Sequence, residues 1–179
     1  MTESAINYGD ALYELAKDEQ LSEEILGEFT QVCGMFTDNP DYIRLLAEPS
    51  VPKKERCAVL DEAFAGRLQP YLLNFLKLLC ERGMIRNTAE CLRRYRMRYN
   101  EDNGILEATA ISAVPLQEAQ KQRLTEKLQA ITGKRIDLQV RTDASVLGGI
   151  RLQMDGKELD GTLRGRLEGL RRTLSDTVL

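Results

Sequence analysis

The 179-residue sequence predicts an α+β fold in which a six-helix bundle precedes a small mixed domain of strands and helices. Two observations support this prediction. Apolar residues recur with helical spacing from Ser4 to about Asn103, interrupted only by short helix-ending and helix-starting signals. From Ile105 onwards the spacing changes to the alternation typical of half-buried strands. This change of period predicts two domains, residues 1–104 and 105–179.

Proline and capping residues mark where the helices of the first half begin and end. Two acidic residues after Ser22 favour a helix start there, because carboxylates stabilise a helix N-terminus. Pro40 and Pro52 are also expected at helix starts, and Pro70 begins a fifth helix that Gly83 ends. The first and sixth helices are marked by apolar faces: Ile6, Leu12, Tyr13, Leu15 and Ala16 in the first, and Ile85, Leu92, Tyr95 and Tyr99 in the sixth.

The second half predicts the order strand, helix, strand, strand, helix. The first strand begins at Ile105, Pro115 is expected to start the following helix, and Gly133 to end it. The apolar residues expected on buried faces are Leu106, Ala108, Ala110 and Val114 in the first strand, Leu124, Leu128 and Ile131 in the helix, and Ile136, Leu138 and Val140 in the second strand.

Gly148 and Gly149 precede a third segment in which Ile150, Leu152 and Met154 alternate with polar residues. Glycine reaches positive φ angles without strain, so the pair is expected to form the turn into this strand. The pair lacks the spacing of a dinucleotide-binding loop. A leucine stripe with helical spacing then predicts a last helix: Leu163, Leu167, Leu170 and Leu174.

The composition excludes most catalytic chemistry. The sequence contains no histidine, which removes Ser-His-Asp triads, Cys-His pairs and histidine-ligated zinc sites. No phosphate-binding P-loop motif occurs. We therefore predict a protein that is not an enzyme, with no catalytic residue, cofactor or metal. Four cysteines lack close spacing and are expected to be buried thiols of a reducing compartment: Cys33, Cys57, Cys80 and Cys91.

Charge and hydropathy indicate how the chain meets other molecules. Residues 1–48 hold eleven acidic and two basic residues, a net charge of −9, whereas the whole chain carries −3. This acidic first third disfavours nucleic acid as a partner. The richest apolar run, residues 71–80, is too short to cross a bilayer, and the N-terminus shows no signal or transit peptide. These features predict a cytoplasmic chain that reaches a membrane only through partners.

The predicted fifth helix leaves two interpretations open. Between Tyr71 and Cys80 only Asn74 and Lys77 are polar, and together with Glu81 they form one narrow stripe. A single core needs an apolar arc of only about 100°. The surplus apolar surface indicates either a central helix wrapped by its own bundle or a groove that holds an amphipathic helix of a partner.

The densest basic cluster consists of Arg93, Arg94, Arg96 and Arg98, beside two tyrosines of the predicted sixth helix. Basic residues interleaved with aromatic ones can bind single-stranded nucleic acid, so a helical RNA-binding adaptor is the alternative function. The interpretation that we favour is a solvated helix face whose arginine stems cover apolar surface.

Four segments, in this order, resemble the delta subunit of F-type ATP synthases, the bacterial counterpart of the mitochondrial oligomycin-sensitivity-conferring protein. They are Y-G-D-A-L-Y-E-L-A at residues 8–16, N-F-L-K-L-L-C-E-R-G at 74–83, N-G-I-L-E-A-T-A-I-S-A at 103–113 and D-A-S-V-L-G-G-I-R-L-Q-M-D-G-K-E-L-D-G-T-L at 143–163. Each segment alone is weakly specific, but their order and spacing together are specific. Two departures, Gly9 where the family usually has alanine and the glycines Gly165 and Gly169 in the last helix, are expected to weaken these helices locally.

The resemblance implies a non-catalytic stator subunit in the peripheral stalk of the rotary, proton-translocating ATP synthase. Residues 1–104 would hold the N-terminal helix of an alpha subunit of the catalytic head between the first and fifth helices. Residues 105–179 would meet the membrane-anchored b subunits through the last helix. It further implies one copy per complex, at the cytoplasmic face of a bacterial cell membrane. Carried over by position, the groove would be lined by Tyr8, Ala11, Leu12, Leu15, Leu72, Phe75, Leu76 and Leu79.

Overall fold

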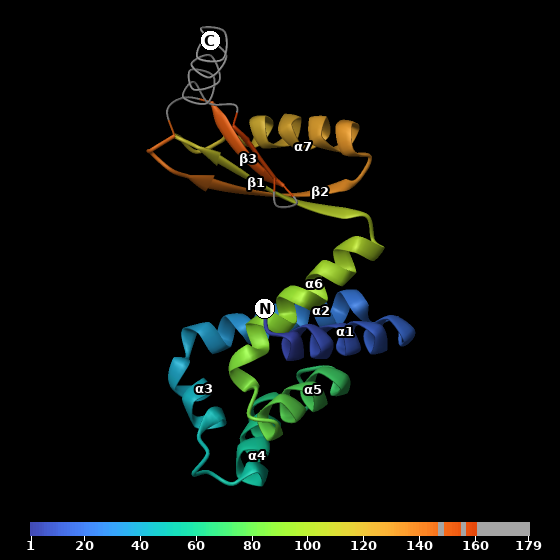
Figure 1. Cartoon of the computed structure of the whole chain (residues 1–179), viewed down its shortest axis with the longest axis vertical. Helices are drawn as coiled ribbons and strands as arrows, with labels where there is room; N and C mark the ends of the chain where they lie inside the picture. The colour runs from blue at the N-terminus through green and yellow to red at the C-terminus, as the bar shows by residue number, and fades with distance from the viewer. Residues whose placement is uncertain (147–148, 155–156, 161–179) are drawn as a thin grey trace, which may run out of the picture. The chain divides into compact units, whose positions relative to one another are not determined.

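The computed structural model divides the chain into two compact units, Met1–Asn100 and Glu101–Leu179 (Figure 1). The structure describes residues 1–146, 149–154 and 157–160. The first unit is helical, whereas the second is built on a β-sheet. This arrangement confirms the predicted α+β class.

The structure describes every residue of the helical unit, and these residues form the six predicted α-helices. Proline opens the third and the fifth, where its missing N–H costs no helical hydrogen bond. The first helix begins after Thr2, whose side chain accepts a hydrogen bond from the backbone N–H of Ala5. The bounds are α1 Glu3–Asp18, α2 Ser22–Asp38, α3 Pro40–Ala47, α4 Lys53–Phe64, α5 Pro70–Glu81, a short 3₁₀ helix η1 Ile85–Asn87, and α6 Thr88–Asp102.

A chain of aromatic contacts that begins and ends on α1 joins four of these helices. Tyr13 of α1 packs edge-on against Tyr95 of α6, with ring centroids 5.3 Å apart. Tyr95 packs against Phe29 of α2 at 6.4 Å, and Phe29 against Phe75 of α5 at 5.7 Å. Phe75 returns to α1 through Tyr8 at 6.5 Å. Since each edge-to-face pair contributes about 0.5–1.5 kcal/mol beyond area burial, these contacts fix how the four helices face one another.

Most of the surface of α5 is buried. Its buried residues are Leu72, Leu73, Phe75, Leu76, Leu79 and Cys80. The predicted polar stripe faces outward: Asn74 and Glu81 are exposed, and half-buried Lys77 forms an ion pair with Asp61 of α4. Leu78 lies in the same stripe and is 37% exposed. α5 is therefore a central helix of its own bundle that leaves some apolar surface at its edge.

Gly9 allows α1 and α6 to pack very closely. A Cβ atom at Gly9 would lie 2.8 Å from the Cβ of Arg94 and 2.8 Å from the carbonyl oxygen of Cys91. Carbon atoms do not approach backbone and side-chain atoms that closely without a shift of the helices. Glycine at this position, where alanine was expected, is therefore a packing requirement as well as a local weakness in helix propensity.

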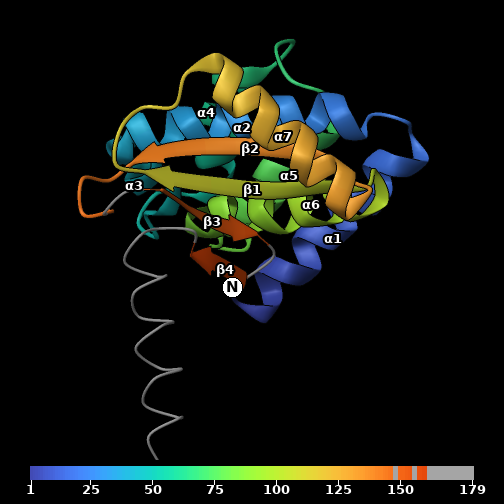
Figure 2. The ribbon, with the colours of Figure 1, turned by 90° about the horizontal axis from the view of Figure 1, so that it is seen from above.

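In its described part, the second unit is a four-stranded mixed sheet with the strand order β2-β1-β3-β4. β1 pairs parallel with β2 and antiparallel with β3, and β3 pairs antiparallel with β4. A parallel pair needs a crossover connection, which α7 supplies along one face of the sheet (Figure 2). The bounds are β1 Ile105–Ser112, α7 Glu118–Thr132, β2 Arg135–Thr142, β3 Ile150–Met154 and β4 Lys157–Asp160.

The core of the second unit lies between the sheet and α7. Strand alternation directs its apolar side chains to this face, as the sequence predicted. The buried members are Ala108, Ala110, Leu128, Ile136 and Leu152. Around them several apolar side chains stay only partly buried: Leu106, Leu116, Leu124, Leu138, Val140, Ile150 and Met154. Within the described residues this core is small and incompletely covered.

The predicted start of the helix in this unit was wrong. α7 begins at Glu118 and not at Pro115, because Gln117 and Gln120 form a reciprocal capping box at that point. The side chain of Gln117 accepts from the backbone of the first turn, and the side chain of Gln120 accepts from the backbone N–H of Gln117. These bonds satisfy N–H groups that Pro115 could not cap.

Two predicted core residues and one strand also differ. Val114 lies beyond the end of β1 and is 66% exposed. Ile131 lies in the last turn of α7 and is 81% exposed. β4, at Lys157–Asp160, pairs with β3 where the sequence predicted no strand. The predicted last helix, in residues 161–179, lies outside the described residues.

Replacing Gly9 by alanine is expected to destabilise the protein. The added Cβ forces α1 and α6 apart, an overpacking cost of about 1–3 kcal/mol that outweighs a gain of about 1 kcal/mol in helix propensity. Gly34→Ala is the matched control, because Gly34 lies in α2 with nothing within 4 Å of its Cβ position. In urea denaturation Gly34→Ala should raise the free energy of unfolding and Gly9→Ala lower it. A rise in both would contradict the close contact.

Candidate partner-binding surface

The structure separates the eight predicted groove residues into core and surface. Five belong to the core of the helical unit, with exposed fractions of 7% or less: Leu12, Leu72, Phe75, Leu76 and Leu79. Tyr8 is half-buried, Ala11 is exposed, and Leu15 is 41% exposed. A partner can therefore reach the last three residues, together with α5 side chains that the sequence did not single out.

Tyr71 and Leu78 are the α5 residues that sequence reasoning missed. At about 100° per residue, they lie on the same side of α5 as Phe75. The sequence shows that this side is apolar, but only the packed structure shows that Tyr71 and Leu78 stay at its outer edge. We call the exposed and half-buried apolar side chains of these two helices the α1/α5 surface: Tyr8, Ala11, Leu15, Tyr71 and Leu78.

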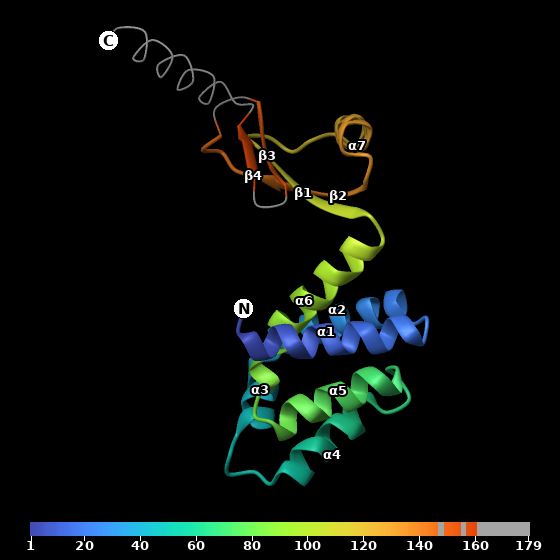
Figure 3. The ribbon, with the colours of Figure 1, turned by 45° about the vertical axis from the view of Figure 1, so that its right-hand side comes forward.

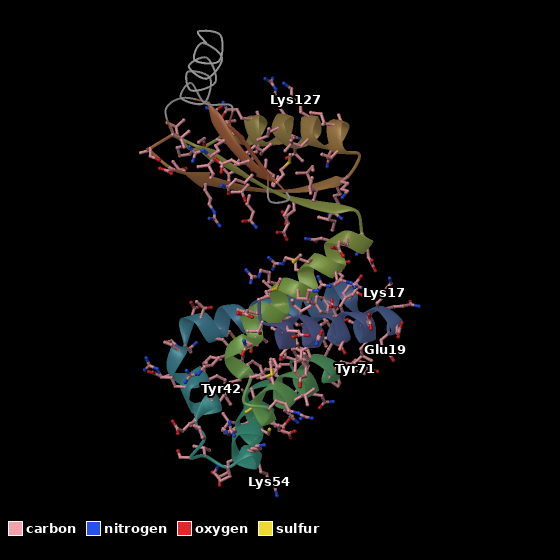
Figure 4. All side chains as sticks on the ribbon, in the orientation of Figure 1. Lys17, Glu19, Tyr42, Lys54, Tyr71 and Lys127 are labelled. Atoms are coloured by element: carbon pink, nitrogen blue, oxygen red, sulfur yellow. The ribbon has the colours of Figure 1, made fainter. Side chains whose placement is uncertain are left out.

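Two contacts bring these sides of α1 and α5 together. The helices lie side by side (Figure 3), and the rings of Tyr8 and Phe75 meet edge to face. Near the end of α1, Tyr71 is hydrogen-bonded to Glu19 (Figure 4), and the carboxylate charge raises the pKa of the Tyr71 hydroxyl. The α1/α5 surface therefore lies on two helices that adjoin at both contacts.

The side chains of the described residues offer little reactive chemistry. They contain no group of three or more histidine, cysteine or acidic residues that could hold a metal ion. Burial raises the pKa of Cys33 to about 12 and that of Cys91 to about 11, so both thiols stay protonated near neutral pH. No helix in the described ranges is both long and apolar enough to cross a bilayer.

The basic cluster on α6 is tied to its own bundle. Arg94 forms a bidentate ion pair with Asp10 of α1, at 2.7 and 3.0 Å. Arg98 lies 4.0 Å from the same carboxylate, and Arg96 donates to a threonine hydroxyl of α2 at 3.0 Å. Arg93 is the exposed member. These contacts support the structural interpretation of the cluster, because three of its four guanidinium groups serve to join helices.

The remaining predicted residues lie in the second unit. Gly149 immediately precedes β3 and has a φ of +85°, in the left-handed region that glycine adopts without strain. Gly148 lies outside the described residues. The same holds for the leucines predicted to face the stalk, Leu163, Leu167, Leu170 and Leu174.

Comparison with known proteins identifies the family. The family model described as ATP synthase delta (OSCP) subunit matches residues 5–174. ATP synthase subunit delta of Desulfitobacterium hafniense (strain DCB-2) is 32% identical over 171 residues, which cover 96% of each chain. The subunit of Lactobacillus gasseri is 31% identical over 173 residues, which cover 96% of this chain and 94% of that one.

A solved structure shares the fold. A chain in the cryo-EM structure of the Toxoplasma gondii mitochondrial ATP synthase hexamer matches with a TM-score of 0.74 at 18% sequence identity. The match covers 97% of this chain and 98% of that chain. Both the helical unit and the small sheet unit are therefore included in the likeness.

The chain belongs to the ATP synthase delta (OSCP) subunit family. This confirms the resemblance that the four sequence segments indicated. Subunits of this family are structural parts of the peripheral stalk, and the protein is accordingly a non-catalytic stator subunit of the F-type ATP synthase. The comparisons give no support to the RNA-binding alternative.

Replacing Asp10 by alanine is expected to lower the free energy of unfolding by about 1–2 kcal/mol, because a charge-assisted, partly buried pair is lost. Asp41→Ala is the control. Its ion pair with Arg44 has the similar distance of 2.8 Å, but both side chains are largely exposed, at 88% and 74%. Denaturant unfolding should therefore show a smaller loss for Asp41→Ala, of about 0.3–1 kcal/mol, which comes mainly from its position in the first turn of α3. A similar small change in both variants would contradict a structural role for the Asp10 pair.

Proposed function

We propose that the helical unit binds the N-terminal helix of an ATP synthase alpha subunit on the α1/α5 surface, and that the second unit contacts the b subunits of the stalk. The observation that supports the first part is a row of apolar side chains at the surface of two adjoining helices. Leu15 is 41% exposed and Leu78 is 37% exposed, with Tyr8 and Ala11 on the same side of α1 as Leu15. Apolar side chains gathered in this way favour an interaction surface.

The α1/α5 surface suits an amphipathic helix. The apolar side of such a helix lies on the exposed leucines while its polar side stays in water. Covering the remaining exposed area of Leu15 and Leu78 contributes on the order of 1 kcal/mol each. Ring contacts with Tyr8 and Phe29 fix Phe75 beneath the surface, so little conformational ordering opposes binding.

For the second unit, the support is family membership together with an incompletely covered core. Apolar side chains on the α7 side of the sheet stay partly buried within the described residues, among them Leu106, Ile150 and Met154. A long helical partner, such as a b subunit, covers apolar area of this kind. The leucine stripe predicted at Leu163, Leu167, Leu170 and Leu174 adds an apolar face from the same chain.

In the assembled enzyme, one copy joins the catalytic head to the membrane-anchored stalk at the cytoplasmic face of the bacterial cell membrane. The chain meets the membrane only through these partners. By holding the head against the torque of the rotor, the connection keeps proton flow coupled to ATP synthesis. Two binding units on one chain fit this task, because each can hold a different partner.

Calorimetric titration of the whole protein with a synthetic peptide of the alpha-subunit N-terminal helix, from the same organism, tests the first part. Leu15→Glu places a carboxylate where the leucine already meets water, so the protein stays folded, and binding is expected to weaken about tenfold or more. Leu78→Glu should act in the same direction from α5. Leu76→Asp is unsuitable, because Leu76 is fully buried and an unpaired buried carboxylate would unfold the bundle.

Leu45→Glu is the matched control for this titration. Leu45 is 43% exposed, close to the 41% of Leu15, but it lies on α3 and outside the α1/α5 surface. Its affinity for the peptide should equal that of the unchanged protein. If circular dichroism shows that all three variants are folded and all three bind the peptide equally, the peptide does not bind at the α1/α5 surface.

A further inference from the structure

A cavity in the helical unit, called the α2–α4 cavity below, is lined by α2, α3, α4 and the segment that follows α4, and is separate from the α1/α5 surface. Its volume is about 460 Å³, within the usual range of about 300–1,000 Å³ for small-molecule sites. None of its lining residues belongs to α1 or α5. The lining residues that matter here are Met35, Phe36, Tyr42, Phe64, Arg67 and Leu68.

The walls of this α2–α4 cavity are aromatic and held in place. The ring of Phe36 packs against Phe64, with centroids 6.3 Å apart, and against Tyr42 at 5.9 Å. The Tyr42 hydroxyl donates to the carbonyl oxygen of Val59 at 3.2 Å, so this polar group is already satisfied by the protein. The cavity therefore offers a ligand a mainly apolar wall, and Gln31 and Asn39 are the uncharged polar residues that also line it.

Arg67 is the one charged residue that lines the α2–α4 cavity. Its side chain is exposed, and it forms no ion pair with any of the residues that the structure describes. By contrast, Arg94 and Arg98 of α6 both meet the carboxylate of Asp10. A mainly apolar lining with one guanidinium as its only charged group matches a molecule that has an apolar body and an anionic head.

We propose that the α2–α4 cavity binds a small amphiphilic carboxylate, an acyl or aryl acid. Its apolar body lies between Phe36, Tyr42 and Phe64, where aromatic faces supply the contact area. Its carboxylate pairs with Arg67, since the guanidinium fork binds a carboxylate through two parallel hydrogen bonds. A neutral or cationic amphiphile lacks this pair and binds more weakly.

Titration of the ¹⁵N-labelled full chain with decanoate, kept below its critical micelle concentration, tests the proposal by NMR. Saturable amide shifts are expected at the lining residues of α2, α3 and α4. Decylammonium, which has the same chain and the opposite charge, should bind about fivefold more weakly, the size of one favourable exposed ion pair. Shifts without saturation, or equal affinity for the two amphiphiles, would overturn the proposal.

Three variants and one further ligand complete the experiment. Arg67→Gln should abolish the preference for decanoate, whereas Arg93→Gln, at an exposed arginine of α6, should retain it. Ala63→Trp should fill the cavity and remove binding, with circular dichroism confirming the fold. Phosphatidylglycerol vesicles distinguish a free acid from a lipid surface. Shifts of the same residues with vesicles and none with decanoate would also overturn the proposal.

Discussion

Edge-to-face contacts between five aromatic rings hold the helical unit together, because they run from α1 through α6, α2 and α5 and return to α1. The close approach that Gly9 permits joins α1 and α6, the same two helices that the Tyr13–Tyr95 contact joins. The buried hydroxyl of Tyr95 is satisfied by the carbonyl oxygen of Ser22 at 3.0 Å, so the contact costs no unpaired polar group. Helix positions in this unit are thus set by a few specific contacts.

This packing also decides what is left for a partner. Phe75 takes part in the aromatic contacts and is buried in the core, whereas Leu15 and Leu78 remain at the surface. A stator subunit needs such a rigid support, since a compliant one would absorb torque instead of transmitting it. The ion pairs of Asp10 with Arg94 and Arg98 add to this stiffness by joining α1 to α6.

The sequence predicted the elements better than it predicted their surroundings. Pro40 and Pro70 mark helix starts because proline itself favours the first position of a helix. The first strand was found at Ile105 because the alternation of apolar residues is also readable from the sequence. Leu76 is buried and Leu78 is partly exposed because of the helices that pack around α5. The periodicity of the sequence does not show which helices these are, so it could not tell which of the two leucines a partner can reach. β4 was missed because its side chains lack the apolar alternation that marks β1, and its pairing with β3 defines it.

The central claim is that the α1/α5 surface carries force between the catalytic head and the stalk. Its most direct test compares ATP-driven proton pumping with ATP hydrolysis in membrane vesicles whose ATP synthase contains the Leu15→Glu subunit. We expect hydrolysis to continue, since this subunit supplies no catalytic group, while pumping falls far below that measured with Leu45→Glu. Full pumping with Leu15→Glu, in a protein that no longer binds the alpha-subunit peptide, would contradict the claim.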